Sequence, residues 1–576
     1  MTSVFRTRLA RSFRAFRRAK EGNVAIMFAI AIVPIIGLVG AAVDYSRANS
    51  ARSALQAALD ATALMISREA AGLSEEEIRQ RAQAYFESLY NHSDASISPL
   101  DVHYTPNSGN GASVSISTRG SIQTAFMKVA GFPTIGFGSS TSTKWGAARL
   151  RVAMALDITG SMEQGRSNPT KLQAMKDAAK DLVDTLKSSA TTTDDVYISI
   201  VPFNVMVNVG KDNVGADWID WTEWEAPPAI LGNNPDSLKQ VGPGSDCPFT
   251  SSSHGFTCTD RPATASNAKK TNTIPDSGSY KGLICPSVDG GDKTPARSGI
   301  YYNGCYDSVE AGTTNMDKTV TGSSASCTGM TNCTCNGKSG SRKSCTGKVS
   351  VKTYTHNWVV NDKSTWTGCV ADRNQDYDIT ADEPSTSGTK YPAMQYTDCK
   401  ANSSLLPMTS AYNANESDNS QNTTTLKGKI NKLAAAGYTN QSIGMHWAWM
   451  SLQQSAPLNA PALESNYQYT NVVILLSDGL NTQNRWYRSK NTNNSNDPAA
   501  LEIDKRQKDL CDNAKAAGVE IFSILVNTDD SETSDVLEYC ASNSKSNHYF
   551  STTTAAGIGS AFNQIATQLS MLRLTQ

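Results

Sequence analysis

At 576 residues the chain is too long for a single hydrophobic core, so two to four domains are expected. Charged residues make up 18% of it and the formal net charge is −1, which argues against a nucleic-acid-binding surface. Ten of the twelve cysteines lie between Cys247 and Cys399, which predicts disulfide bonds formed in an oxidising compartment.

The N-terminus combines a basic arm with a long apolar segment. Residues 1–22 contain six arginines and a lysine, whereas Gly22–Val43 carries no charge. As a helix, such a segment spans ~30 Å of hydrocarbon, so we expect a transmembrane helix over 23–43. The basic arm would stay in the cytoplasm, which predicts a single-pass protein of a bacterial inner membrane with its bulk in the periplasm or at the cell surface. A cleavable signal is the alternative, although no clear A-x-A site follows the segment.

Helical spacing of small and apolar residues continues to Met65 without Gly or Pro, so one long helix is expected. Its first part reads E-G-N-V-A-I-M-F-A-I-A-I-V-P and a later part reads A-R-S-A-L-Q-A-A-L-D-A-T-A-L. These strings resemble the N-terminal region of TadG-like proteins of the tight-adherence (Flp) pilus machinery. The resemblance covers about residues 20 to 70 and implies a pilus-associated envelope protein.

A small pilin-like α+β module is predicted to follow the long helix. Ser74 and Glu77 form a capping-box pattern for a helix that reaches about Tyr90. Short alternating segments bounded by Gly, Pro and Asn then predict three strands, at Val102–Tyr104, Val114–Ser117 and Ile122–Phe126.

The next apolar segment ends in a cluster of oxygen-bearing side chains. Arg151–Met162 reads R-V-A-M-A-L-D-I-T-G-S-M, which is typical of a strand buried in a parallel sheet. Asp157, Thr159 and Ser161 then lie at the carboxyl end of that strand, where open α/β sheets bind ligands. Carboxylate and hydroxyl oxygens suit Mg²⁺, or Ca²⁺ or Mn²⁺, rather than a soft metal.

Two distant segments have matching features. Asn471–Thr482 is a second buried-strand pattern that ends in Asp478, and Thr439 precedes a helix-like stretch, Gln441–Gln453. Together the three segments resemble the metal-ion-dependent adhesion site of von Willebrand factor A domains, although that family usually has D-x-S-x-S where this chain has D-x-T-G-S.

The resemblance implies roles for five residues. Ser161, Thr159 and Thr439 would bind the metal directly or nearly so, whereas Asp157 and Asp478 would act largely through bound waters. One coordination position would remain for a carboxylate from an Asp or Glu of a protein partner, such as a pilus or envelope component.

The alternation of strands and helices predicts an α/β fold with a doubly wound, mostly parallel sheet. A strand is expected at Val196–Phe203, and the pattern resumes after a long gap. The later elements are a helix near Leu426–Leu433, strands at Val472–Leu476, Val519–Val526 and His548–Ser551, and helices at 499–517, 534–541 and 555–572. Cys511 and Cys540 fall on consecutive helices, and we expect them to form a disulfide.

The gap is too long for a structureless loop, so residues 205–425 are predicted to form a disulfide-rich insertion. Zinc is the alternative that Cys333-x-Cys335 suggests. It is disfavoured because the chain has no C-x-x-C pair and His254 and His356 are isolated.

One string inside the insertion has the oxygen spacing of a calcium loop. Position 6, where an EF-hand needs Gly, is Tyr377, so an acidic solvated loop is the alternative. The residues at positions 1, 3, 5, 7, 9 and 12 are Asp372, Asn374, Asp376, Asp378, Thr380 and Glu383.

We therefore expect a membrane-anchored pilus-assembly or adhesion protein that binds a partner carboxylate through a metal ion. A structural pilus-associated scaffold, in which the metal only stabilises loops, is the alternative. An enzyme is not expected, since G-x-G-x-x-G, Walker and G-x-S-x-G motifs are all missing. The predicted domains are a cytoplasmic arm (1–22), a transmembrane helix (23–43), a helix extension with the pilin-like module (44–147), a von Willebrand factor A-like domain (148–204 with 426–576) and the insertion (205–425).

Overall fold

The computed structural model describes residues 23–575 except 71–72, 107–110, 146–147, 165–168, 191, 293–297, 338–339, 341, 413–415, 465–466, 492, 529–532 and 543–544. The predicted cytoplasmic arm, 1–22, lies outside the described residues. The chain divides into two compact units, Met1–Ala148 with Leu572–Gln576, and Arg149–Met571.

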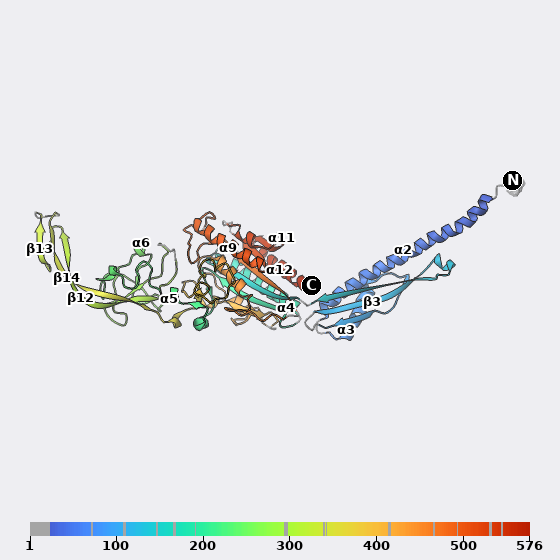
Figure 1. Cartoon of the computed structure of the whole chain (residues 1–576), viewed down its shortest axis with the longest axis horizontal. Coiled ribbons are helices and arrows are strands. Elements are labelled where there is room, and N and C mark those ends of the chain that lie inside the picture. Colours follow the sequence, from blue (N-terminus) through green and yellow to red (C-terminus); the bar gives the residue numbers. More distant parts are fainter. Residues whose placement is uncertain are drawn as a thin grey trace. The chain divides into compact units, whose positions relative to one another are not determined.

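A single helix, α2, runs from Asn23 to Glu69, which confirms the long helix expected from the sequence (Figure 1). Within the described part of the chain it is the one helix that is long and apolar enough to cross a membrane. Its large apolar side chains from Val24 to Val43 are exposed, except for the half-buried Ile32. From Gly40 onward one face of α2 is buried, so the helix changes from an exposed apolar rod into part of a packed core.

The rest of the first unit packs on this second part of α2. Helix α3 (Glu75–Leu89) begins with the predicted capping box between Ser74 and Glu77. Leu55, Leu59 and Ile66 of α2 share a core with α3 and with an antiparallel sheet. The sheet contains β1 (Ala95–Ile97), β2 (Asp101–Thr105), β3 (Ala112–Gln123) and β4 (Thr134–Trp145).

The second and third strands predicted for this module form a single strand, β3. Gly120 lies between the two predicted segments and makes no turn. Because it has no side chain, the side chain of Ile97 can approach it closely and the strand continues through it. A Cβ at Gly120 would lie 2.4 Å from Cδ1 of Ile97. β4 pairs with β3 along its whole length, which makes a long hairpin.

The second unit contains a six-stranded sheet in the order β17-β6-β5-β18-β19-β20. Numbered by chain order within the sheet, this is 3-2-1-4-5-6, the doubly wound order. The pairs β5–β6, β18–β19 and β19–β20 are parallel, and the edge pair β17–β6 is antiparallel. The predicted doubly wound, mostly parallel sheet is therefore confirmed. The strands are β5 (Ala148–Asp157), β6 (Val196–Phe203), β17 (Leu406–Ser410), β18 (Gln468–Ser477), β19 (Val519–Val526) and β20 (Tyr549–Thr552).

The central strands are buried on both faces because nearly every side chain in them is apolar. All ten residues of β5 are buried. One face of the sheet packs against α8, α9 and α10 in a continuous apolar core. Helix α4 begins at the buried Lys171 and also contacts β6. The helices of this unit are α4 (Lys171–Ser189), α7 (Leu426–Lys432), α8 (Gln441–Met450), α9 (Pro498–Ala516), α10 (Val536–Cys540), α11 (Lys545–His548) and α12 (Ala555–Thr575).

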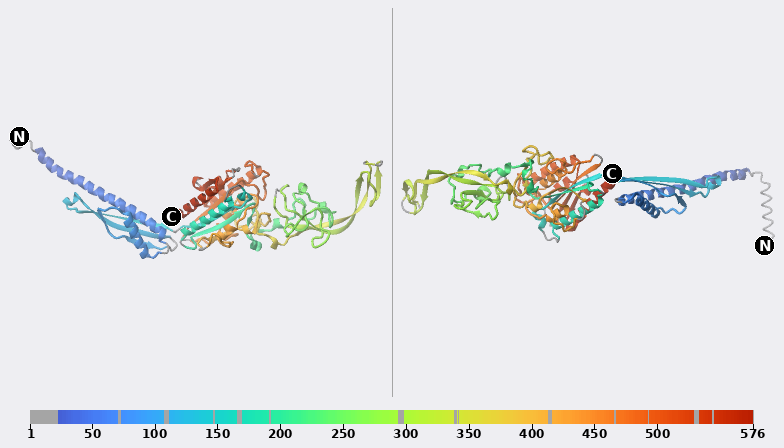
Figure 2. Two further views of the ribbon diagram at one scale, coloured as in Figure 1. Left: turned by 180° about the vertical axis from the view of Figure 1, so that it is seen from behind. Right: turned by 90° about the horizontal axis from the view of Figure 1, so that it is seen from below.

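The range predicted as an insertion, 205–425, contains short strands and one long hairpin, β12 with β14 (Figure 2). β17 lies inside this range, yet it is the edge strand of the main sheet. The elements are β7 (Val207–Asn208), β8 (Ile219–Asp220), α5 (Thr222–Glu225), α6 (Ser251–His254), β9 (Cys258–Thr259), β10 (Lys270–Thr271), β11 (Leu283–Pro286), β12 (Gly304–Thr321), β13 (Thr331–Asn336), β14 (Ser344–Val360), β15 (Cys369–Val370) and β16 (Tyr391–Pro392).

All twelve cysteines are paired in six disulfides. One of them joins Cys511 of α9 to Cys540 of α10, the pair expected from the sequence. The other five lie between Cys247 and Cys399, and each joins two cysteines that are consecutive among the cysteines of the chain.

Replacing both Cys511 and Cys540 with alanine is expected to lower the free energy of unfolding by about 3 kcal/mol. This is the chain-entropy effect of opening a loop of this size, since the two cysteines are 29 residues apart. Urea unfolding of the two oxidised proteins measures the difference. A change below about 1 kcal/mol would mean that the packing of α9 on α10 holds this region without the bond.

Candidate metal centre

Two adjacent strands end side by side at the carboxyl edge of the main sheet. β5 ends at Asp157 and β18 ends at Ser477, directly before Asp478. In the sheet, β6 lies on one side of β5, whereas β18 and β19 lie on its other side. This reversal of strand order is the position at which doubly wound sheets bind ligands.

Hydrogen bonds link four of the five predicted site residues. The Oγ of Ser477 donates to Oδ2 of Asp157 at 2.5 Å, and the backbone N–H of Thr159 donates to Oδ1 of Asp157 at 2.7 Å. The hydroxyls of Thr159 and Ser161 are 3.0 Å apart. Ser161 Oγ in turn donates to Oδ1 of Asp478 at 2.7 Å, across 317 residues of sequence. The ends of β5 and β18 therefore form one connected cluster of oxygen atoms.

The loop that carries Thr439 lies beside the first of these strand ends. Backbone N–H groups of Gly160 and Ala436 donate to the carbonyls of Gly437 and Ile158, at 3.0 Å and 2.8 Å. Thr439 is buried, and its backbone N–H donates to Oγ1 of Thr482 at 2.8 Å. Backbone bonds thus hold this third segment against the loop of Thr159 and Ser161.

A lysine that the sequence interpretation missed completes the cluster. Nζ of Lys171 lies 2.9 Å from Oδ2 of Asp478, and its side chain is 1% exposed. Lys171 follows the N-cap Thr170 and occupies the buried face of α4 together with Leu172 and Met175. A lysine in register with an apolar stripe was the signal that could have identified it, because a buried ammonium requires a carboxylate partner.

The described part of the site holds two buried carboxyl groups, Asp157 and Asp478, and one buried ammonium, Lys171. Burial raises the pKa of Asp157, and the nearby carboxylate of Asp478 raises it further, to about 7. Asp157 and Asp478 are 0% and 1% exposed, and Lys171 is the buried cation bonded to Asp478. An additional cation is therefore electrostatically favourable here.

The structure disperses the residues of the candidate calcium loop. Asp372 accepts two bonds from Asn440 Nδ2 at 3.0 Å, and Asp378 pairs with Arg506, whose Nε lies 2.7 Å from Oδ2. Asn374 accepts a bond from Arg485, while Asp376 has a side chain that is 91% exposed. Among the described residues these carboxylates form no group of three with oxygen atoms close enough for one ion. The arginines that bind Asn374 and Asp378 are Arg485 and Arg506, more than a hundred residues away in the sequence.

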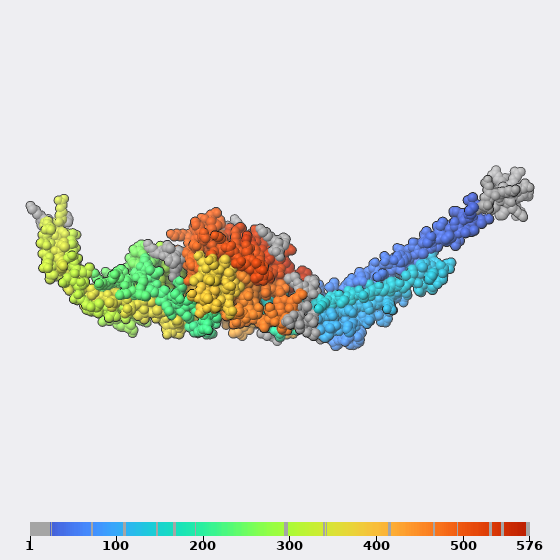
Figure 3. All heavy atoms as spheres, in the orientation of Figure 1, coloured from blue at the N-terminus to red at the C-terminus, as the bar shows by residue number. Residues whose placement is uncertain are grey.

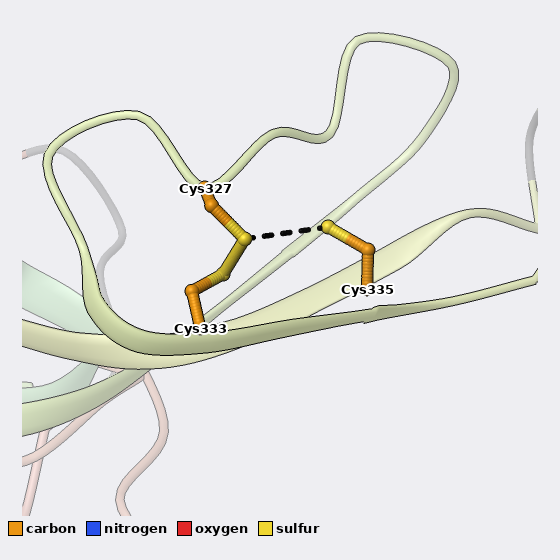
Figure 4. A group of neighbouring side chains, drawn as sticks. All are labelled: Cys327, Cys333 and Cys335. Carbon is orange, nitrogen blue, oxygen red and sulfur yellow. Dashed lines mark hydrogen bonds between the residues drawn. A yellow bond between two sulfur atoms is a disulfide. The ribbon is translucent and has the colours of Figure 1, made fainter.

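In the described part of the insertion, two neighbouring disulfides form a cluster of sulfur atoms. Cys327, Cys333 and Cys335 have sulfur atoms within 4.8 Å of one another (Figure 4). Cys327 is bonded to Cys333, however, and Cys335 is bonded to Cys345. Sulfur atoms in disulfides are not thiolate ligands, so this cluster does not support the zinc alternative.

Comparisons with known proteins give a match to one family model and distant matches to solved structures. Residues 22–65 match the family model described as "Putative Flp pilus-assembly TadE/G-like". No curated protein matches the chain. The pilus adhesin SpaC of Lactobacillus rhamnosus GG aligns at 10% identity and a TM-score of 0.30, over 83% of this chain and 35% of SpaC. The von Willebrand factor domain of the type V pili tip protein Mfa5 from Porphyromonas gingivalis aligns at 11% identity and a TM-score of 0.28, over 74% of this chain and 96% of that one.

This chain thus spans about a third of the length of SpaC. Both TM-scores are low, so the fold assignment depends on the strand order and the parallel pairing described above. The family model covers the exposed apolar part of α2 and most of its buried continuation. The N-terminal region of this chain, residues 22–65, is TadE/G-like.

Proposed function

We propose that this protein is a membrane-anchored pilus-assembly or adhesion protein that binds a partner carboxylate through a divalent cation. The ligands are Asp157, Thr159, Ser161, Thr439 and Asp478. The observation that carries the proposal is the hydrogen bond from Ser161 to Asp478, which joins loops 317 residues apart into one oxygen cluster. The TadE/G-like segment supports the pilus context, and the exposed apolar half of α2 supports the anchor.

The chemistry of the donor set fits Mg²⁺, Mn²⁺ or Ca²⁺. Ser161 gives its hydroxyl hydrogen to Asp478 and its oxygen accepts the hydroxyl hydrogen of Thr159, so one lone pair of the Ser161 oxygen is left to face a cation. The other donors are also oxygens, which these hard cations prefer over nitrogen or sulfur. The excess of buried carboxylate over ammonium adds an electrostatic reason for cation binding.

A partner can approach because the rim of the cluster is only partly covered. Ser161, Gly437 and Gly479 are half-buried, whereas Asp157 and Thr439 beneath them are buried. A partner's Asp or Glu carboxylate is the oxygen ligand that a bound cation would still accept at this rim. The strength of that contact would depend on the charge of the ion, because the site is partly shielded from water.

Replacing Ser161 with alanine is expected to weaken Mn²⁺ binding at least tenfold, because one direct ligand and its bond to Asp478 are lost. Titration of the full chain in detergent with Mn²⁺, followed by electron paramagnetic resonance, measures free and bound metal. Ser199→Ala is the matched control, since Ser199 of β6 bonds the hydroxyl of Ser451 in the same domain. Equal Mn²⁺ binding by the wild type and Ser161→Ala would contradict the proposed site.

A scaffold in which the metal only stabilises the loops is a second candidate function. The ammonium of Lys171 supports it, because Lys171 already neutralises Asp478 and the loops are held by their own hydrogen bonds. In the native host, Ser161→Ala distinguishes the two functions. The adhesion function predicts assembled pili with divalent-dependent attachment lost, whereas the scaffold function predicts normal attachment.

A further inference from the structure

The connection between β3 and β4, residues 124–133, exposes a group of large apolar side chains. Phe126, Val129 and Phe132 are 47%, 88% and 60% exposed. This hairpin tip contains one lysine, Lys128, and no acidic residue. Exposed apolar clusters of this kind mark surfaces that contact a membrane or a partner protein.

The hairpin tip has a defined conformation. The backbone N–H groups of Val129 and Phe132 donate to the carbonyls of Phe126 and Met127, at 3.1 Å and 3.0 Å. Oγ1 of Thr124 closes the base with a bond of 2.6 Å to the carbonyl of Phe132. The apolar side chains are therefore exposed on an ordered turn.

Contacts with α2 fix the position of the hairpin tip along the helix. Asp44 is buried, and its carboxylate accepts bonds from the backbone N–H groups of Ala125, Phe126 and Met127 at 2.8–2.9 Å. One turn earlier, Phe126 packs on Gly40. A Cβ at Gly40 would lie only 2.5 Å from Cβ of Phe126, whereas a Cβ at Gly37 would meet nothing within 4 Å.

The carboxylate of Asp44 remains ionised at neutral pH. Burial alone would raise its pKa, but the N–H bonds from Met127, Ala125 and Phe126, together with the charge of Arg47, hold the pKa below its ordinary value of 3.8. The bond between α2 and the tip is therefore charge-assisted under physiological conditions.

The hairpin tip contacts Gly40, which lies inside the uncharged segment of α2. That segment ends at Val43, so Gly40 is three residues, or about 5 Å at ~1.5 Å per residue, within it. The large apolar residues of α2 before Gly40 are exposed, except for the half-buried Ile32. Figure 3 shows the hairpin ending partway along α2, with no other described atoms beside the N-terminal part of the helix on the visible face.

We propose that the hairpin tip inserts into the outer leaflet of the bilayer that α2 spans. The apolar side chains of Phe126, Val129 and Phe132 would enter the boundary between headgroups and acyl chains, a depth of about 5–10 Å for interfacial anchors. Lys128 would reach lipid phosphates. With two points of attachment, the pilin-like module cannot tilt freely relative to the membrane. This inference depends on the membrane anchor of the proposed function.

The test uses an environment-sensitive fluorophore at Val129→Cys in the oxidised full chain, reconstituted into vesicles of phosphatidylethanolamine and phosphatidylglycerol. Nitroxide-labelled lipids are expected to quench this probe several-fold more strongly than the same probe at Ser142→Cys. Ser142 is exposed on β4, about 30 Å from the tip at ~3.3 Å per residue. A third probe, at Leu38→Cys on the exposed apolar part of α2, reports insertion of the helix itself.

Each outcome decides the proposal. Quenching at Val129 well above that at Ser142 supports it. Quenching at Leu38 with none at Val129 overturns the inference and leaves the anchor intact. Failure to quench the Leu38 probe overturns both the anchor and the inference.

Two glycines of α2 give a matched pair of variants. Gly40→Ala places a methyl group against Phe126 and is expected to bring quenching of the Val129 probe toward the Ser142 value. Gly37→Ala is expected to leave it unchanged, because the space at Gly37 is open. Equal quenching in the two variants would contradict placement of the tip by α2.

Discussion

Lys171→Met is expected to lower the free energy of unfolding by about 3 kcal/mol or more when divalent cations are chelated. The substitution keeps most of the side-chain volume but removes the ammonium that lies 2.9 Å from Asp478. Asp478 and Asp157 would then be buried at one sheet edge with this positive charge missing. Urea unfolding with EDTA and with Mg²⁺ measures the effect. Part of the loss should be recovered in Mg²⁺, because a bound cation would supply the missing charge.

Lys180→Met is the control for Lys171→Met. Lys180 is on the same helix and forms an ion pair with Asp177, whose carboxylate is exposed. Loss of this ion pair should lower the free energy of unfolding by no more than about 1 kcal/mol. Adding Asp478→Asn to Lys171→Met should restore stability in EDTA, since it removes the buried carboxylate that Lys171 binds. If Lys171→Met were as stable as the control, the charge balance described for this site would be wrong.

Trp447→Ala is expected to lower the free energy of unfolding by about 3–5 kcal/mol, the usual cost of removing a buried Trp side chain. Trp447 of α8 is completely buried. Its ring centroid is 4.2 Å from that of Tyr391 and 6.1 Å from that of Trp218, both from the range predicted as an insertion. The loss should therefore loosen the main sheet and the disulfide-rich region together.

Chemical unfolding and limited proteolysis check this coupling. Cleavage within 205–425 should become faster in Trp447→Ala under native conditions, at the same time as the unfolding midpoint falls. Trp486→Ala is the comparison, since Trp486 is half-buried and contacts Arg485 at the surface. A destabilised Trp447→Ala protein with unchanged proteolysis would show that the two regions are held together elsewhere.

The strand ends that carry Asp157 and Asp478 could be predicted from the sequence because each follows an uninterrupted apolar segment. Such segments form buried parallel strands, and parallel strands end at the same edge of a sheet. Cys511 and Cys540 could be paired because they fall on consecutive helices. These inferences need only local patterns and one rule of topology.

Features that depend on distant partners could not be predicted in this way. The spacing of Asp372 and Asp378 resembles a calcium loop, but it contains no information about Asn440 or Arg506, which bind them. β17 is short and contains Pro407, so its pairing with β6 at the sheet edge had no visible pattern. Lys171 is one lysine among several on an amphipathic helix, and its carboxylate partner is 307 residues away.

The central strands β5 and β18 are neighbours in the sheet although Asp157 and Ser477 are 320 residues apart. At roughly 5–20 residues per second of synthesis, β5 emerges some 15–60 s before β18 exists. Five of the disulfides lie between these strands, and each joins cysteines no more than 30 residues apart. In the export that the proposed function requires, oxidation of the nascent middle of the chain can therefore precede closure of the sheet, and the oxygen cluster at the sheet edge forms only after Asp478 has been translocated.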